Sequence, residues 1–114
     1  RDLVDATHGG LFDAYPVTSR AKRQNPVMHL LEAYLALARV APEGGWLDRA
    51  RELVTLFERR LTDPRAGALL EHFAEDWTAA EAPLAGIVEP GHHYEWVWLL
   101  HEYQTLTGDD VGAW

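Results

Sequence analysis

Three stretches of helical periodicity occur in this chain, and they differ in how much of each helix surface is apolar. Apolar side chains cover about half the circumference over residues 26–40 and nearly all of it over residues 91–107, whereas residues 46–61 are apolar on one face only. A helix that is apolar on most sides needs neighbours on most sides, while an amphipathic helix keeps one side in water. The contrast therefore predicts two inner helices with one outer helix between them.

Proline and glycine residues mark where these helices begin and end. Pro26 suits the first turn of the first helix, with Asn25 as its N-cap, because proline lacks an N–H that would be unpaired there. Pro42 ends the first helix, and Gly108 ends the third. Between the second and third helices, residues 68–77 are expected to form a short excursion resembling a β-hairpin.

The predicted fold class is all-α. Inner, outer and inner helices in alternation are typical of α/α toroids and solenoids, in which one helical hairpin cannot cover its own apolar face. His29 and His92 are 63 positions apart, which fits one inner helix, one outer helix and their connections. Because the chain starts at Arg1 in mid-pattern, we expect residues 1–114 to be one piece of a longer helical domain.

Composition excludes several kinds of partner. The formal charge of -8 opposes binding to nucleic acid, which needs clustered Lys and Arg. No apolar run approaches the roughly 20 residues of a membrane-spanning helix, so no membrane partner is expected. The chain has no cysteine, which excludes disulfides and thiolate metal sites. A cytoplasmic location is the default expectation.

Two His-x-x-Glu steps carry most of the chemistry in this sequence. His29 precedes Glu32 by three positions in the first helix, and His92 precedes Glu95 by three in the third. Side chains three residues apart lie on one helix face, so each helix would offer an imidazole and a carboxylate to a common side. The carboxylate can hold the proton of one ring nitrogen while the other nitrogen accepts a proton. The steps therefore predict proton transfer.

Each step also has simpler interpretations. A single helical His with a Glu one turn later is more often a surface or capping pair, but two such steps on otherwise apolar helices favour a function, because burying ionisable groups costs free energy. Two His and two Glu are also plausible zinc or iron ligands. Di-metal helical bundles use the order Glu-x-x-His, however, and the order is reversed in this chain, so no metal is expected.

Other residues near the steps have two interpretations each. Trp96 is either a core residue or a stacking platform for a sugar ring, and Asn25 is either an N-cap or a ligand-binding residue. His93 is expected on a different helix face from His92, where it packs or lines the rim. A small basic cluster precedes the first helix and is expected on a solvated loop rather than at an anion site: Arg20, Lys22 and Arg23.

Two segments, residues 24–33 (QNPVMHLLEA) and 89–96 (EPGHHYEW), resemble the hallmark segments of the N-acylglucosamine 2-epimerase family, which also includes aldose–ketose isomerases and cellobiose 2-epimerases. The helix start at residues 46–48, the turn at 63–69 and the stretch 73–77 are similar as well. The resemblance covers nearly the whole chain, and the pair of motifs is specific.

The resemblance implies an (α/α)6 barrel, of which this chain would supply about a third, with a sugar pocket at one mouth. By that resemblance His92 matches an acid/base histidine and Glu95 the carboxylate beside it, while His29 and Asn25 match residues that hold the opened sugar. A second acid/base histidine and an arginine are expected outside this chain. No cofactor is expected. The expected site is His92, Glu95 and His29 for catalysis, and Asn25, Glu32 and Trp96 for substrate binding.

The resulting hypothesis is a sugar epimerase or isomerase that moves a proton at C2 of a ring-opened sugar through histidine. Which sugar it takes, and whether the proton returns to C2 or to C1, stay open, as do a homodimer and a nucleotide effector. The alternative is a non-catalytic toroid fragment that binds carbohydrate or protein. Convergent His and Glu at one cavity would favour catalysis, and an open aromatic groove without them would favour binding.

Overall fold

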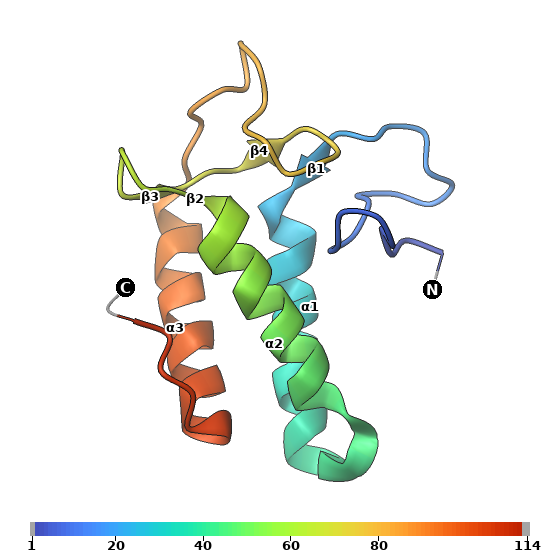
Figure 1. The fold of residues 1–114 in the computed structure, drawn as a ribbon, viewed down its shortest axis with the longest axis vertical. Coiled ribbons are helices and arrows are strands. Elements are labelled where there is room, and N and C mark those ends of the chain that lie inside the picture. The colour runs from blue at the N-terminus through green and yellow to red at the C-terminus, as the bar shows by residue number, and fades with distance from the viewer. Residues whose placement is uncertain (1, 113–114) are drawn as a thin grey trace.

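The computed structural model describes residues 2–112, and its three long helices lie side by side with short strands gathered at one end (Figure 1). Residues 1, 113 and 114, which the expected domain includes, lie outside the described residues. The strands sit at the end where α1 and α3 begin (Figure 1). The helical elements are α1 (Gln24–Val40), the 3-10 turn η1 (Pro42–Gly44), α2 (Trp46–Leu56), the π-helical turn η2 (Phe57–Leu61) and α3 (Pro90–Thr107).

Helix α1 begins two residues earlier than its periodicity predicts. Its N-cap residue is Arg23 in an extended conformation, without a side-chain cap, so the expected N-cap role of Asn25 is wrong. The backbone N–H of Gln24 donates instead to the carbonyl of Glu71 at 3.2 Å. The segment between β3 and β4 thus satisfies an N–H that a capping side chain would otherwise bind, and Asn25 lies within the first helical turn.

The amphipathic stretch 46–61 is helical throughout, but its last turn changes type. The buried residues of α2 are Ala50, Leu53 and Val54, on the face that packs on α1 and α3. Over η2 the hydrogen bonds widen to the π pattern, with Phe57 and Leu61 buried. Periodicity of apolar residues does not reveal such a change of hydrogen-bond register, because the buried side chains keep the four-residue spacing of an α-helix.

The excursion after α2 is two separate antiparallel ladders rather than one hairpin over 68–77. Strand β2 (Thr62–Asp63) pairs with β3 (Ala68–Leu69), while β4 (His72–Phe73) pairs with β1 (Lys22–Arg23) just before α1. Gly67 closes the first turn at a φ of +60°, a conformation that favours glycine. The second ladder ties the chain between α2 and α3 to the start of α1.

One apolar core joins the three helices and the strands. Trp96 of α3 stacks on Phe57 with ring centroids 4.3 Å apart, and both rings are buried. The expectation that α3 is covered nearly all round is not met within residues 2–112, because Tyr94, Val97 and Trp98 are exposed. Within residues 2–112, every helix is too short or too polar to cross a membrane.

Candidate active site

The first His-x-x-Glu step forms the pair that helix geometry predicts and reaches the second step across the helices. In α1, Nδ1 of His29 lies 3.2 Å from Oε2 of Glu32. The same nitrogen lies 3.8 Å from Oε1 of Glu95 on α3. All three side chains are partly open to solvent, with 53%, 49% and 34% of their surfaces exposed. One imidazole thus faces two carboxylates at the junction of α1 and α3, where a small molecule can reach it.

The second step does not form its predicted pair. Nδ1 of His92 lies 3.0 Å from both carboxylate oxygens of Glu71 and 2.9 Å from Nε2 of Gln24. Glu95 therefore turns toward His29, and a different carboxylate takes its expected place beside His92. Within residues 2–112, Nε2 of His92 has no hydrogen-bond partner.

Glu71 is the functional candidate that sequence reasoning missed. It lies between β3 and β4 and is 6% exposed. Both of its backbone polar groups are hydrogen-bonded: its N–H donates to the carbonyl of Ile87 at 3.1 Å, and its carbonyl accepts from the N–H of Gln24 at 3.2 Å. Its side chain accepts a further hydrogen bond from Nε2 of Gln24 at 3.0 Å. The available signal was an acidic residue directly after the apolar run from Ala68 to Leu70.

Trp96 lies in the core, which corrects its expected role as a sugar-stacking residue. The indole is 1% exposed and packs on Phe57, so neither face is open to a ring. Its Nε1–H donates to Oε1 of Gln24 at 2.7 Å. Trp96 therefore supports the site from behind, through the same Gln24 amide that contacts Glu71 and His92.

A polar hollow of about 350 Å³ adjoins His92. Asn25 lines it, and the His29, Glu32 and Glu95 group does not. The structure thus divides the predicted site residues into a hollow with His92 and Asn25 and an open group around His29. The residues that line the hollow are Arg23, Asn25, Glu71, His72, Ile87, Glu89 and His92.

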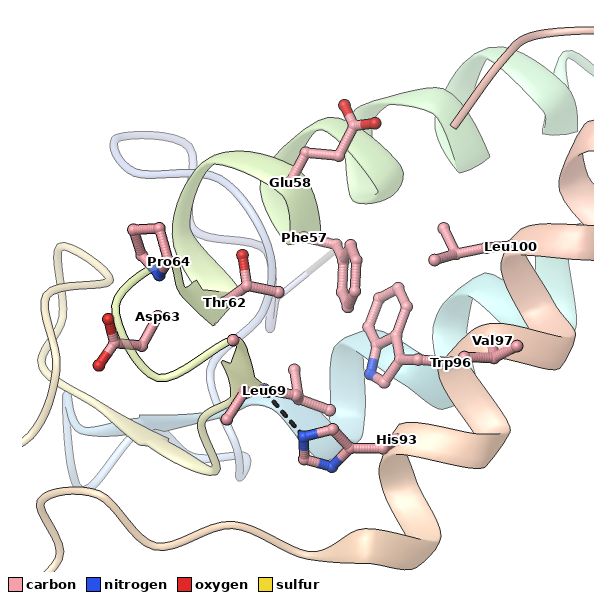
Figure 2. Close-up of a pocket in the computed structure, with 12 residues that line it drawn as sticks. Phe57, Glu58, Thr62, Asp63, Pro64, Leu69, His93, Trp96, Val97 and Leu100 are labelled. Carbon is pink, nitrogen blue, oxygen red and sulfur yellow. Dashed lines mark hydrogen bonds between the residues drawn. The ribbon is translucent and has the colours of Figure 1, made fainter. Parts of the chain in front are cut away.

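A second, mostly apolar pocket of about 320 Å³ lies between η2, the β2–β3 turn and α3 (Figure 2). His93 borders it and uses both ring nitrogens: Nε2 accepts the backbone N–H of Leu69 at 2.9 Å, and Nδ1 donates to the carbonyl of Glu89 at 3.0 Å. With both nitrogens occupied by backbone groups, His93 joins α3 to β3. His93 thus packs at the border of this pocket, in line with the packing or rim position expected of it on a different helix face from His92.

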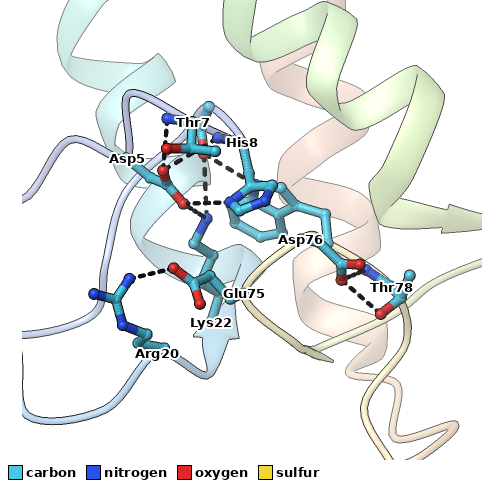
Figure 3. A network of polar contacts seen from close by, with 10 residues as sticks. Asp5, Thr7, His8, Arg20, Lys22, Glu75, Asp76 and Thr78 are labelled. Atoms are coloured by element: carbon cyan, nitrogen blue, oxygen red, sulfur yellow. Dashed lines mark hydrogen bonds and ion pairs between the residues drawn. The ribbon is translucent and has the colours of Figure 1, made fainter.

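In the basic cluster before α1 each cation has an acidic partner, and Arg20 and Arg23 are solvent-exposed as expected, whereas Lys22 is not. Figure 3 shows Arg20 paired with Glu75 and Lys22 with Asp5. Arg23 pairs with Asp13 at 2.6 Å. Lys22 was expected in solvent, but only 1% of its surface is exposed. The groups around its ammonium explain this burial.

The Lys22 ammonium lies 2.5 Å from Oδ2 of Asp5 and over the rings of Trp77 and Phe12, at 4.7 and 5.1 Å from their centroids. Burial alone would raise the pKa of the Asp5 carboxyl. Hydrogen bonds from Lys22, from the backbone of His8 and Thr7, and from the His8 ring outweigh burial and hold that pKa well below its usual range.

Among residues 2–112, two groups of residues have the donor atoms for a metal ion. The ligand atoms of His29, Glu32 and Glu95 lie within 4.8 Å of one another, as do those of Asp5, His8 and Glu75. In the second group Asp5 already binds the Lys22 ammonium, whereas the first group is open. The first group, an imidazole with two carboxylates, can also exchange protons as an acid or base, and this use needs no metal ion.

Comparison with curated proteins relates this arrangement to carbohydrate isomerases. The chain is 42% identical over 89 residues to a mannose-6-phosphate isomerase of Rhizobium meliloti (strain 1021), covering 75% of this chain and 22% of that protein. It is 32% identical over 88 residues to a cellobiose 2-epimerase of Bacteroides fragilis, covering 77% and 21%. The chain therefore spans about a fifth of the length of these relatives.

Solved structures give the same fold. The cellobiose 2-epimerase from Spirochaeta thermophila DSM 6192 matches with a TM-score of 0.74 and 30% identity, covering 94% of this chain and 29% of that one. That from Bacillus thermoamylovorans B4167 matches with a TM-score of 0.78, 18% identity, and coverage of 95% and 30%. The expected fold class is confirmed: the chain folds as part of an α/α barrel. The model of the N-acylglucosamine 2-epimerase family matches this chain over residues 1–114, so the chain belongs to that family.

Proposed function

We propose that this chain is the part of a carbohydrate 2-epimerase or aldose–ketose isomerase that carries one of its proton-transfer histidines, His92. The observation that carries the proposal is the position of His92 at a polar hollow beside Asn25, with its Nδ1 held by a buried carboxylate and its other nitrogen unpartnered within residues 2–112. A neutral imidazole with one free nitrogen can act as a general base.

The proposed reaction starts from the ring-opened aldose. His92 takes the proton from C2, the electron pair of that C–H bond forms a double bond between C1 and C2, and the C1 carbonyl oxygen takes the negative charge. Return of a proton to C2 on the opposite face gives the epimer. Return to C1, with the O2 hydroxyl proton moving to O1, gives the ketose. One enediolate links both outcomes.

The open group at the junction of α1 and α3 has a separate role in the proposal. His29, held by Glu32 and Glu95, contacts the oxygens of the opened sugar and exchanges protons with them. Asn25 donates hydrogen bonds to the sugar from the wall of the hollow. In this proposal Trp96, which is buried, makes no contact with the sugar.

The test replaces His92 by Asn in the intact enzyme and follows exchange of the C2 hydrogen with solvent deuterium by NMR. Losing a general base lowers such a rate by roughly 10²- to 10⁴-fold. His101→Asn is the matched control, since His101 is an exposed histidine further along the same helix. Unchanged exchange in His92→Asn removes His92 from the mechanism.

A non-catalytic carbohydrate-binding fragment is the second candidate, and one observation favours it. Two aromatic side chains of α3 are open to solvent, Tyr94 at 78% and Trp98 at 52% exposure, and exposed aromatic faces suit sugar rings. The same exchange experiment separates the candidates, because a binding module takes up sugar without moving deuterium into C2.

A further inference from the structure

The protons around His92 can be assigned from its neighbours. Trp96 Nε1 is a donor only, so the Gln24 atom that it meets at 2.7 Å must be the amide oxygen. The NH₂ group of Gln24 then faces Glu71 and His92, at 3.0 and 2.9 Å. The orientation of this amide is therefore fixed by a buried indole rather than chosen freely.

Two proton arrangements remain for Nδ1 of His92. If Nδ1 is unprotonated, it accepts from Gln24, and its lone pair faces both oxygens of the Glu71 carboxylate at 3.0 Å. If Nδ1 carries the proton, it donates to that carboxylate, while Gln24 donates to Oε2 of Glu71. Hydrogen bonds to an ionised carboxylate are roughly twice as strong as neutral ones. The second arrangement therefore prevails.

We infer that Glu71 is the positioning residue of His92, and that it holds the proton on Nδ1 so that Nε2 is the atom that takes the substrate proton. When His92 becomes an imidazolium, the same carboxylate stabilises the new charge. Gln24 and Trp96 hold the carboxylate in place. This inference rests on the proposed function and assigns it a nitrogen and a partner that the His-x-x-Glu motif does not contain.

The surroundings of Glu71 favour this role over a purely structural one. A buried carboxylate is costly unless it is paired and hydrogen-bonded, and Lys or Arg would give a purely structural one a permanently charged partner. Among residues 2–112, Glu71 has no Lys or Arg within ion-pair distance, and its side-chain partners are the Gln24 amide and the His92 ring. The buried carboxylate thus faces the ring that the proposed function assigns to proton transfer, rather than a permanent cation.

The experiment uses ¹⁵N NMR of histidine-labelled intact enzyme, because the two ring nitrogens have distinct shifts when protonated and unprotonated. The wild-type His92 is expected to show a protonated Nδ1 and an unprotonated Nε2. Glu71→Gln should shift the ring toward the Nε2–H form and lower kcat for C2 exchange by roughly 10²-fold, with KM little changed. Glu71→Asp should restore part of the Nδ1–H form of His92 and part of kcat.

Glu75→Gln is the matched control, since Glu75 lies four residues further on and pairs with the exposed Arg20. It should leave the His92 shifts and kcat unchanged. An Nε2–H ring in the wild type overturns the inference even where Glu71→Gln does not fold. So does a folded Glu71→Gln with unchanged shifts and kcat. A wild type with the assigned tautomer but no C2 exchange overturns the proposed function instead, so the two failures are distinguishable.

Discussion

Two buried carboxylates in this protein, Asp5 and Glu71, are stabilised by partners of different kinds. Asp5 is 4% exposed and binds the ammonium of Lys22, which lies between aromatic rings. Glu71 is 6% exposed and faces the neutral amide of Gln24 and the ring of His92. A permanently charged partner fixes a carboxylate as part of the fold, whereas the partner of Glu71 is the ring that the proposed function assigns to proton transfer.

The largest expected effect on stability is at the Asp5 site. Lys22→Met keeps the length of the side chain and removes its charge, which leaves Asp5 buried without a cation. The free energy of unfolding should fall by about 3 kcal/mol, as measured by urea denaturation of the intact enzyme. Arg20→Met removes a surface partner of Glu75 and should change the free energy of unfolding by less than about 1 kcal/mol. Equal losses in the two variants would erase the distinction between the buried and the exposed pair.

Acidic pH should remove the stabilisation that the same site provides. Because the hydrogen bonds from Lys22 and its neighbours hold the pKa of Asp5 below its unfolded value of about 3.9, the carboxylate stabilises the fold above that pH. This contribution is lost as the pH falls below about 4 toward the folded pKa. The wild type should therefore lose more unfolding free energy on acidification than Asp5→Asn. Parallel pH curves for the two proteins would contradict the assignment.

The smallest expected stability effect is in the open group. Glu95→Gln removes one carboxylate from His29 at a solvent-exposed contact, which should change the unfolding free energy by about 0.5 kcal/mol or less while slowing C2 exchange. Glu102→Gln is the control, because Glu102 joins Arg39 across the same two helices without a histidine. It should leave exchange unchanged. Similar slowing in both variants would mean that helix contact, rather than His29, sets the rate.

The parts of the site that follow from one helix could be predicted from the sequence. His29 and Glu32 meet because three positions bring side chains to one face, and α1 and α3 begin within two residues of the periodic stretches, while the second stretch changes at Phe57 from α2 to η2. The two strand ladders were missed as separate units, because strands of two residues carry too little pattern to show which partner each one pairs with.

The parts that depend on distant segments could not be predicted. Glu71 meets His92 from 21 positions away because β4 pairs with β1, and no spacing rule links them. Lys22 has the composition of a surface residue, and its burial depends on Asp5, 17 positions earlier. Trp96 had two interpretations, and its stacking on Phe57 decided between them.

One paired measurement tests the central distinction most directly: unfolding free energy and C2 hydrogen exchange, both recorded for Lys22→Met and for Glu71→Gln in the intact enzyme. We expect Lys22→Met to lose stability and, at temperatures where it stays folded, to keep its exchange rate. We expect Glu71→Gln to change in stability by about 1 kcal/mol and to lose roughly 10²-fold in exchange. The reverse pattern, with exchange following Lys22 rather than Glu71, would contradict the assignment of His92 and its carboxylate to proton transfer.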